Sequence, residues 1–458
     1  MTSLQDSLRK YVKPHMYHSG QGEKDGFIER TFGTRRLRVW LMRAAIGVLS
    51  LIFLWYIISA PSGSASFAPR PTRPSRPDLS ISEGSQVNGM AGLVEFQKPK
   101  QKVMGLVFAG RREFVSILDC YLQRNLVRNG GWLDGVLWII NPKRAEDDEY
   151  LWNLTNSVPE YTAYTTREEE NGTVRNYSPR YKYCEPDTIY IKIDDDVVFF
   201  EDGTVAAMVK RLVENPQYFG VSANIVNNPI LSWVHYHKET YLPFFPEVTP
   251  AVDFSRDDAK YRDSLSDWRT SDLPLWKGPK RFQFTGLEAA PFKNHRWLPL
   301  PPNFPLEKTP AGALGAEGAA EYNAANIGMR SWAIAAQGHY SFLTHLQKSE
   351  LYRYKMDLWH YRYNRLSINF FAFNSNDILK DPITGSDEAF LTVKLPLKLQ
   401  RPVVLEGSGI AVHFGFQRQV GGHGNIKGSA LNDTDLIHRY GMYAEEFICG
   451  KPWGSPMI

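Results

Sequence analysis

The sequence has 458 residues, of which 43% are hydrophobic and 13% aromatic, so it can build a large buried core in one or two domains. The formal net charge is +4, and residues 1–43 account for this excess, because they carry 9 Lys/Arg against 4 Asp/Glu. The rest of the chain is close to neutral. Net charge therefore gives no support for a nucleic-acid partner, and none is predicted.

Residues 44–60 form an apolar run that only Ser50 and Ser59 interrupt. At roughly 17 residues, the run reaches the lower limit for a membrane span and suits a thin early-secretory bilayer. Four arginines directly precede it: Arg35, Arg36, Arg38 and Arg43. The positive-inside rule then predicts a single-pass type II anchor in the Golgi or ER membrane, with 1–43 as a cytosolic tail. A cleaved signal peptide is the alternative, which roughly 40 mostly polar residues upstream disfavour.

Residues 61–101 are rich in Pro, Ser and Gly, which predicts a semi-rigid stem in front of a luminal domain at 102–458. Three cysteines in that domain allow one disulfide and one free thiol, with the pairing left open: Cys120, Cys184 and Cys449. Three or four glycosylation sequons agree with a luminal orientation, since Pro179 makes the third a poor acceptor; they begin at Asn153, Asn171, Asn176 and Asn432.

Strand and helix patterns alternate through the first half of the luminal domain. Apolar runs predict strands, and apolar residues at helical spacing predict helices. The expected strands are 102–110, 135–141, 161–165 and 189–193, and the expected helices begin at Arg111–Arg112 and span 146–154 and 204–214. This alternation predicts an α/β fold with a largely parallel sheet.

The second half continues the pattern after one interruption. Residues 241–322 lose periodicity and collect Pro, Trp and charge, which predicts an insertion that acts as a lid or selects the acceptor. The other expected elements are strands at 219–224, 365–373, 402–405 and 409–414, and helices at 331–356 and from Ser386, a predicted N-cap.

Three consecutive carboxylates, Asp194-Asp195-Asp196, follow the apolar run that begins at Thr188. Like charges this close raise one another's pKa, and a divalent cation removes the penalty. Ligands of open α/β sheets bind at the carboxyl ends of strands, where this triplet falls. The triplet therefore predicts a metal site, the alternative being a solvated acidic turn.

Four features in this order resemble the GT-A class of nucleotide-sugar-dependent glycosyltransferases. They are Ala109-Gly-Arg-Arg after the first strand, the DxD-type triplet, the acidic pair Asp387-Glu388 opening a late helix, and His413 after the last core strand. The resemblance covers roughly residues 102–450 and implies a Rossmann-like mixed sheet with helices on both faces. In detail the chain is most similar to fungal type II membrane proteins of uncharacterised specificity.

The resemblance implies a cation held by oxygen and imidazole ligands, Mn²⁺ or Mg²⁺, with imidazole favouring Mn²⁺. Asp196 would bind the metal directly and His413 would be a second ligand, the alternative being an ordinary core histidine. Asp194 and Asp195 would orient the donor's ribose and the waters of the metal.

Arg111 and Arg112 are candidates for contacts to the donor's base and diphosphate, because guanidinium groups suit phosphate oxygens. Glu388 would be the general base that deprotonates the acceptor hydroxyl, with Asp387 as the fallback. The order here is Asp-Glu, whereas the family usually has Glu-Asp. Acids also favour the first turn of any helix through its dipole, which is the alternative explanation.

The expected activity is metal-dependent transfer of a sugar from a nucleotide-diphosphate sugar to a glycan or glycoprotein acceptor, with inversion. By resemblance, the donor is a UDP-hexose, with GDP-mannose second. Weaker candidates are asparagines near the expected donor sugar, a histidine pair and an aromatic segment: Asn224, Asn227 and Asn228; His235 and His237; Trp359 to Asn364. Two other classes stay open, a catalytically inactive glycan-binding or scaffolding protein and a metal-dependent hydrolase. The sequence leaves the oligomeric state open.

Overall fold

The computed structural model describes residues 97–142, 144–165, 178–249, 268–279, 282, 290–313, 331–420 and 430–450. All of these belong to one compact unit that begins at Ala91. The predicted cytosolic tail, the membrane anchor and nearly all of the stem lie outside the described residues. Within them, no helix combines the length and the apolar character that crossing a bilayer requires.

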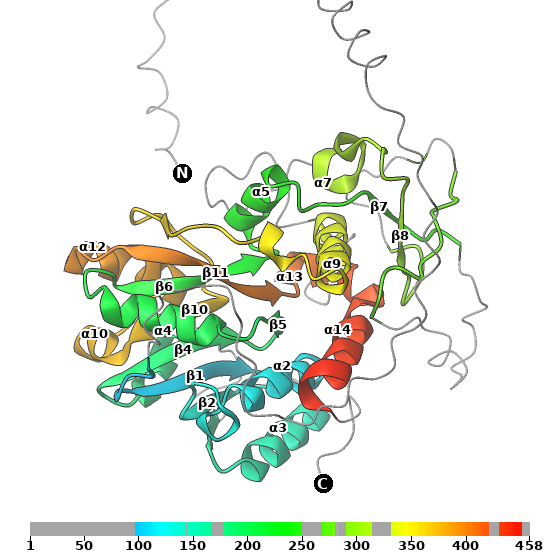
Figure 1. Ribbon diagram of the computed structural model, residues 1–458. Helices are drawn as coiled ribbons and strands as arrows, with labels where there is room; N and C mark the ends of the chain where they lie inside the picture. The colour runs from blue at the N-terminus through cyan, green and yellow to red at the C-terminus, as the bar shows by residue number, and fades with distance from the viewer. Residues whose placement is uncertain are drawn as a thin grey trace, which may run out of the picture. The chain divides into compact units, whose positions relative to one another are not determined.

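Nine strands among the described residues form one mixed sheet (Figure 1). Four neighbouring strands are parallel, in the order β3-β2-β1-β4. Their bounds are Lys102–Ala109 for β1, Gly135–Ile140 for β2, Tyr161–Thr165 for β3 and Thr188–Asp194 for β4. All residues of β2 are buried, as the long apolar runs of the sequence predict for a sheet covered on both faces.

The other half of the sheet is mixed in direction. Strand β10 runs antiparallel between β4 and β6, and β11 is parallel to β6 and antiparallel to β5 and β9. The bounds are Val197–Phe200 for β5, Gly220–Val226 for β6, Trp359–His360 for β9, Phe370–Asn374 for β10 and Val403–His413 for β11. The predicted α/β class is therefore confirmed as a mixed α/β fold.

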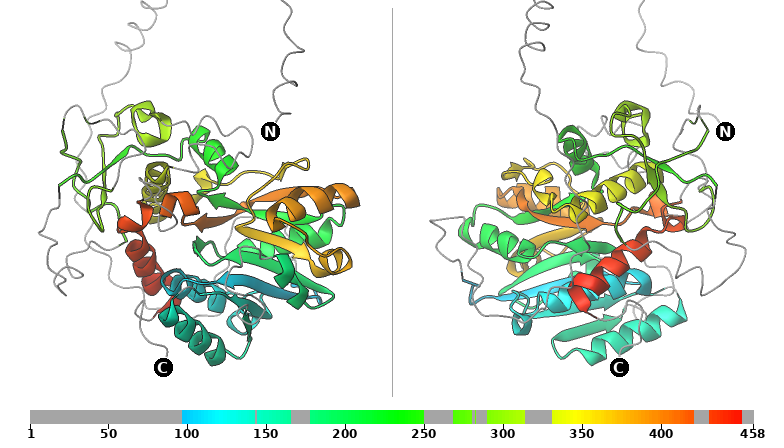
Figure 2. Two further views of the ribbon diagram at one scale, coloured as in Figure 1. Left: turned by 180° about the vertical axis from the view of Figure 1, so that it is seen from behind. Right: turned by 45° about the vertical axis from the view of Figure 1, so that its right-hand side comes forward.

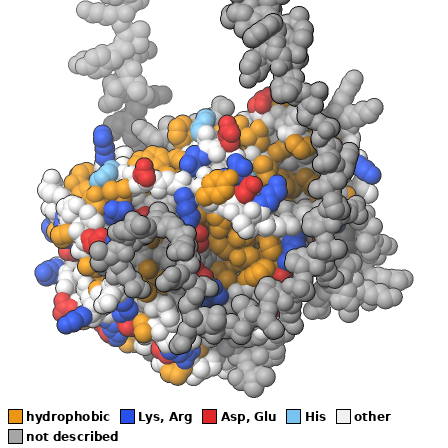
Figure 3. All heavy atoms as spheres, in the orientation of Figure 1, with side chains coloured by type: hydrophobic (Ala, Val, Ile, Leu, Met, Phe, Trp, Pro, Cys, Tyr) orange, Lys and Arg blue, Asp and Glu red, His pale blue; other side chains and the backbone are white. Residues whose placement is uncertain are grey.

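Helices pack against the sheet and against one another. The longer ones are α2 (Arg112–Arg124), α3 (Ala145–Ser157), α4 (Thr204–Glu214), α5 (Pro229–His237), α9 (Trp332–Gln347) and α14 (Leu436–Ala444). Helix α4 covers β6 and β11, and α14 packs against α2 and α9 (Figure 2). Short helices are α7 (Pro310–Ala313), α10 (Ser375–Lys380), α11 (Asp387–Ala389), α12 (Leu395–Leu399) and α13 (Gln417–Val420). In the face drawn in Figure 3, basic and acidic side chains are intermingled.

Three predicted boundaries are wrong. Helix α9 ends at Gln347 instead of 356, because Ser349 takes a left-handed backbone conformation with φ of 59°. The strand expected from residue 365 begins at Phe370. The two strands expected at 402–405 and 409–414 form the single strand β11, whose register shifts between Glu406 and Ile410. A glycine is required in that bulge, since a Cβ on Gly407 would lie 2.1 Å from the Met356 carbonyl oxygen.

The described part of the 241–322 insertion packs on α9. Strands β7 (Phe244–Pro246) and β8 (Trp297–Pro299) pair antiparallel there. Trp297 and Trp332 are fully buried, with ring centroids 5.7 Å apart and edge-to-face geometry. This part of the insertion behaves as core, and its role in selecting an acceptor stays a prediction.

A disulfide joins Cys120 on α2 to Cys449 near the end of the described chain, across 329 residues. It resolves the pairing that the sequence left open and leaves Cys184 as a buried free thiol, and burial raises the pKa of that thiol.

We expect the double variant Cys120→Ser/Cys449→Ser to lower the free energy of unfolding by about 2 to 4 kcal/mol, because the cross-link restricts the unfolded chain. Urea unfolding of the full chain measures this, with Cys184→Ala as the control that breaks no link. Equal midpoints for the double variant and the wild type would contradict the prediction.

Candidate active site

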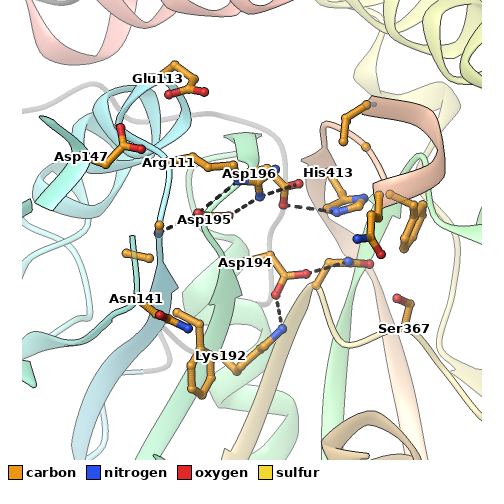
Figure 4. Close-up of a pocket in the computed structure, with 18 of the residues that line it drawn as sticks. Arg111, Glu113, Asn141, Asp147, Lys192, Asp194, Asp195, Asp196, Ser367 and His413 are labelled. Atoms are coloured by element: carbon orange, nitrogen blue, oxygen red, sulfur yellow. Dashed lines mark hydrogen bonds and ion pairs between the residues drawn. The ribbon is translucent and has the colours of Figure 1, made fainter. Parts of the chain in front are cut away.

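The acidic triplet lies in the turn from β4 to β5, at the carboxyl end of a strand in the middle of the sheet. Each of its three side chains has a different set of partners (Figure 4). The backbone holds the turn on both sides. The Asp194 N–H donates to the Asn369 carbonyl (2.9 Å), and the Phe414 N–H donates to the Asp196 carbonyl (2.8 Å).

Asp196 lies beside His413, which ends β11 across from β5. Its carboxylate is 3.3 Å from His413 Nε2 and 3.0 Å from the guanidinium of Arg111. Both Asp196 and His413 are buried. Burial alone would raise the pKa of Asp196, but the charges of His413 and Arg111 hold it well below its ordinary value. Burial likewise opposes protonation of His413, yet Asp196 raises the pKa of that imidazole.

Asp195 turns toward the loop between β1 and α2. Its carboxylate accepts hydrogen bonds from the Gly110 N–H (3.0 Å) and from the Arg111 guanidinium. Burial raises the pKa of Asp195, and the ion pair with Arg111 opposes that shift. In the structure Asp195 pairs with Arg111, and the contacts to ribose and metal-bound waters stay a prediction.

Asp194 is held from the opposite side by Lys192 and Asn369. The Lys192 ammonium forms an ion pair with one carboxylate oxygen, and Asn369 Nδ2 donates to the other at 2.8 Å. Burial tends to lower the pKa of Lys192, but the nearby Asp194 and then Asp387 raise it. Sequence reasoning missed both partners. Lys192 does carry a signal, because it precedes Asp194 by two residues and so shares its face of the strand.

Asp194, Asp196 and His413 each offer one ligand atom, and these atoms all lie within 4.8 Å of one another. Two carboxylate oxygens and one imidazole nitrogen suit a borderline divalent ion such as Mn²⁺ better than Mg²⁺, which prefers oxygen. The donor set therefore fits the cation that the triplet predicted, with Asp194 as a further ligand.

These residues open onto a cavity of about 560 Å³. Arg111 lines it together with Asn141 and Arg144, whose guanidinium binds the buried Asp147 carboxylate at 2.6 and 2.7 Å. Arg112 is exposed and lies outside the cavity lining, with Nε 4.0 Å from Asp147. The structure thus brings one of the two predicted arginines into the cavity and adds Arg144.

The acidic pair lines the same cavity from α11. Ser386 caps this helix as predicted, since its hydroxyl accepts from the Ala389 N–H at 3.4 Å. The Glu388 carboxylate is held by Arg365 Nε (2.6 Å) and the Ser367 hydroxyl (3.2 Å). Asp387 accepts from the Tyr181 hydroxyl at 3.2 Å. Seven of the eight predicted site residues line this cavity: Arg111, Asp194, Asp195, Asp196, Asp387, Glu388 and His413.

The weaker sequence candidates lie outside the cavity lining. His235 is buried against the Asn224 side chain at 2.9 Å, and burial lowers the pKa of its imidazole to about 3. Asn227 and Asn228 are buried as well. Trp359 pairs with Leu405 at the sheet as part of β9.

No protein-family model and no curated protein sequence matches the chain. Solved structures similar to part of the chain include the mannosyl-3-phosphoglycerate synthase of Rubrobacter xylanophilus (16% identity, 28% of this chain, 40% of that chain, TM-score 0.22). Another is the glucosyl-3-phosphoglycerate synthase of Mycobacterium tuberculosis, with Mn²⁺, UDP and phosphoglyceric acid bound (13% identity, 28% of this chain, 44% of that chain, TM-score 0.22). A third is the 4-diphosphocytidyl-2C-methyl-D-erythritol synthase of Anaerococcus prevotii (13% identity, 27% of this chain, 55% of that chain, TM-score 0.20). The chain spans about half the length of these proteins, so its function is argued from its own site.

Proposed function

We propose that the protein is a metal-dependent glycosyltransferase of the GT-A type that uses a nucleotide-diphosphate sugar as donor. One observation carries the proposal: a three-ligand metal group and an acidic pair line one cavity of about 560 Å³. A cavity of this size suits a ligand as large as a nucleotide sugar. Its position at the carboxyl end of β4 agrees with ligand binding in open α/β sheets.

Each part of the cavity has a task in this reaction. Asp194, Asp196 and His413 would hold a divalent cation, which neutralises charge that develops on the leaving diphosphate. The guanidinium of Arg111 lies beside that group and would bind a phosphate oxygen. The Glu388 carboxylate lines the same cavity and would accept the proton of the acceptor hydroxyl as its oxygen attacks the anomeric carbon.

The finer specificity remains part of the proposal. A UDP-hexose is the preferred donor and GDP-mannose the second choice, and the acceptor is a glycan or glycoprotein. The apolar run at 44–60 and the arginines before it support a type II orientation in the Golgi or ER membrane, with this cavity in the lumen. The disulfide between Cys120 and Cys449 supports an oxidising compartment.

Release of free nucleotide from UDP- and GDP-sugars, measured with and without Mn²⁺ and with a mixed glycan acceptor pool, tests the proposal. We expect release that requires Mn²⁺ and rises when acceptor is added. Binding of glycans without any nucleotide release would favour an inactive scaffolding protein. Metal-dependent cleavage of glycans or esters without use of a nucleotide sugar would favour a hydrolase.

A further inference from the structure

The segment after His413 is fastened to the end of β6 by two side-chain amides that face each other. Asn227 follows β6, and Gln419 lies on α13. Asn227 Nδ2 donates to Gln419 Oε1 at 3.0 Å, and Gln419 Nε2 donates to Asn227 Oδ1 at 3.2 Å. Both side chains are buried, with residue exposures of 7% and 1%. We call these two residues the amide pair.

The amide pair also binds the backbone on both sides of the turn that follows His413. Asn227 Nδ2 donates to the Phe414 carbonyl at 2.9 Å, and the Phe416 N–H donates to Gln419 Oε1 at 3.0 Å. The ring of Phe416 in turn packs on the His413 imidazole, with centroids 4.5 Å apart. The pair therefore fixes the backbone and the aromatic ring that surround the histidine.

Asn227 reaches His413 directly as well. The backbone carbonyl oxygen of Asn227 lies 3.4 Å from His413 Nδ1. On the other side of the ring, His413 Nε2 lies 3.3 Å from the Asp196 carboxylate. A proton on Nδ1 that is shared with this carbonyl leaves the Nε2 lone pair directed at the metal group. Histidine ligands commonly donate their second ring nitrogen to a carbonyl in this manner, and the partner sets both tautomer and ring orientation.

The backbone of Asn227 is unusual in a way that serves this contact. Its φ is 60°, a left-handed conformation that non-glycine residues rarely take and that carries a free-energy penalty. Glycine would adopt it without strain, but glycine lacks the amide that holds Phe414 and Gln419. An asparagine here supplies the left-handed turn and the amide together.

We propose that Asn227 and Gln419 are positioning residues that present Nε2 of His413 to the metal. The inference rests on the proposed function, because it requires a cation at Asp194, Asp196 and His413. It assigns a role to two residues outside the cavity's ligand set, and to Asn227 a role other than contact with the donor sugar. A merely structural pair would contribute to stability and leave metal affinity unchanged.

The variant Gln419→Met removes the amide while keeping a side chain of similar length. Binding of Mn²⁺ to the detergent-solubilised full chain, without any donor, is measured by calorimetry. We expect roughly 10- to 100-fold weaker binding, the range found when partners of metal-bound histidines are removed. Electron spin echo spectroscopy of bound Mn²⁺ should show weaker modulation from the imidazole nitrogen than in the wild type.

Gln337→Met is the matched control. Gln337 is also fully buried and its amide makes three hydrogen bonds, to Ala311, Leu242 and Thr309, on the α7 side of α9. The Gln337→Met variant should be less stable than the wild type while keeping the wild-type Mn²⁺ affinity.

Asn227→Gly is the second test variant, because it retains the left-handed turn and the backbone carbonyl but loses the side-chain amide. His339 also binds the Phe414 carbonyl (2.7 Å), so this variant should stay folded.

The outcomes separate the inference from the proposed function. If the wild type and both variants bind Mn²⁺ equally, with the same nitrogen modulation, the positioning role is wrong and the metal site stands. If the wild type itself binds no Mn²⁺, the proposed metal site is wrong and the inference fails with it. Weaker binding in Gln419→Met and Asn227→Gly, but not in Gln337→Met, supports the role.

Discussion

Replacing Asp196 by alanine is expected to lower kcat for sugar transfer by roughly 10²- to 10³-fold or more, because it removes stabilisation made mainly in the transition state. Asp196 contributes a ligand atom to the metal group and is the ion-pair partner of His413. Arg111 retains Asp195 as a partner in the variant, so the fold should persist. Steady-state kinetics in saturating Mn²⁺ and donor measure the loss.

Asp377→Ala is a suitable control for this variant. Asp377 is a half-buried carboxylate paired with Arg401 at 2.8 Å, and it lies outside the cavity lining. It should lose some stability and keep its turnover. Near-normal turnover of Asp196→Ala, or of the wild type in excess chelator, would contradict a metal-dependent reaction.

Local patterns predicted several elements together with their bounds. The bounds of α4 and β3 match the predicted ranges, because helical spacing and short apolar strands are properties of neighbouring residues. The triplet, the acidic pair and His413 also meet in one cavity, as expected for residues near the ends of core strands. The direction of each strand and the order of the strands had to come from the structure.

The partners of the triplet could not be predicted in the same way. Asn369 reaches Asp194 only because β10 runs antiparallel beside β4, a pairing between segments about 180 residues apart. Arg111 and Arg112 are adjacent in sequence, yet one precedes α2 and the other begins it, so their side chains point in different directions. The partner of Cys120 likewise depended on where α14 carries the end of the chain.

Glu388→Gln is the second variant with a large expected effect. The glutamine keeps the size of the side chain and its hydrogen bond to Ser367 but cannot accept a proton. We expect donor binding within a few-fold of the wild type, and transfer slower by roughly 10²- to 10⁴-fold. Glu406→Gln is the matched control, since Glu406 also pairs with an arginine, Arg211 (2.8 Å), and a serine, Ser408 (2.7 Å), outside the cavity lining.

The same assignment predicts the stereochemical outcome. A base on the wall opposite the leaving diphosphate serves direct displacement, in which the acceptor oxygen attacks the far side of the anomeric carbon and inverts it. Glu388 and Asp387 line the cavity on α11, and the metal group lies on β4, on the turn between β4 and β5, and on β11. Proton NMR of the first product formed should therefore show an anomeric configuration opposite to that of the donor. Retained configuration would rule out Glu388 as the base, even if Glu388→Gln were inactive. Full activity of Asp387→Asn would leave Glu388 as the single candidate base in the pair.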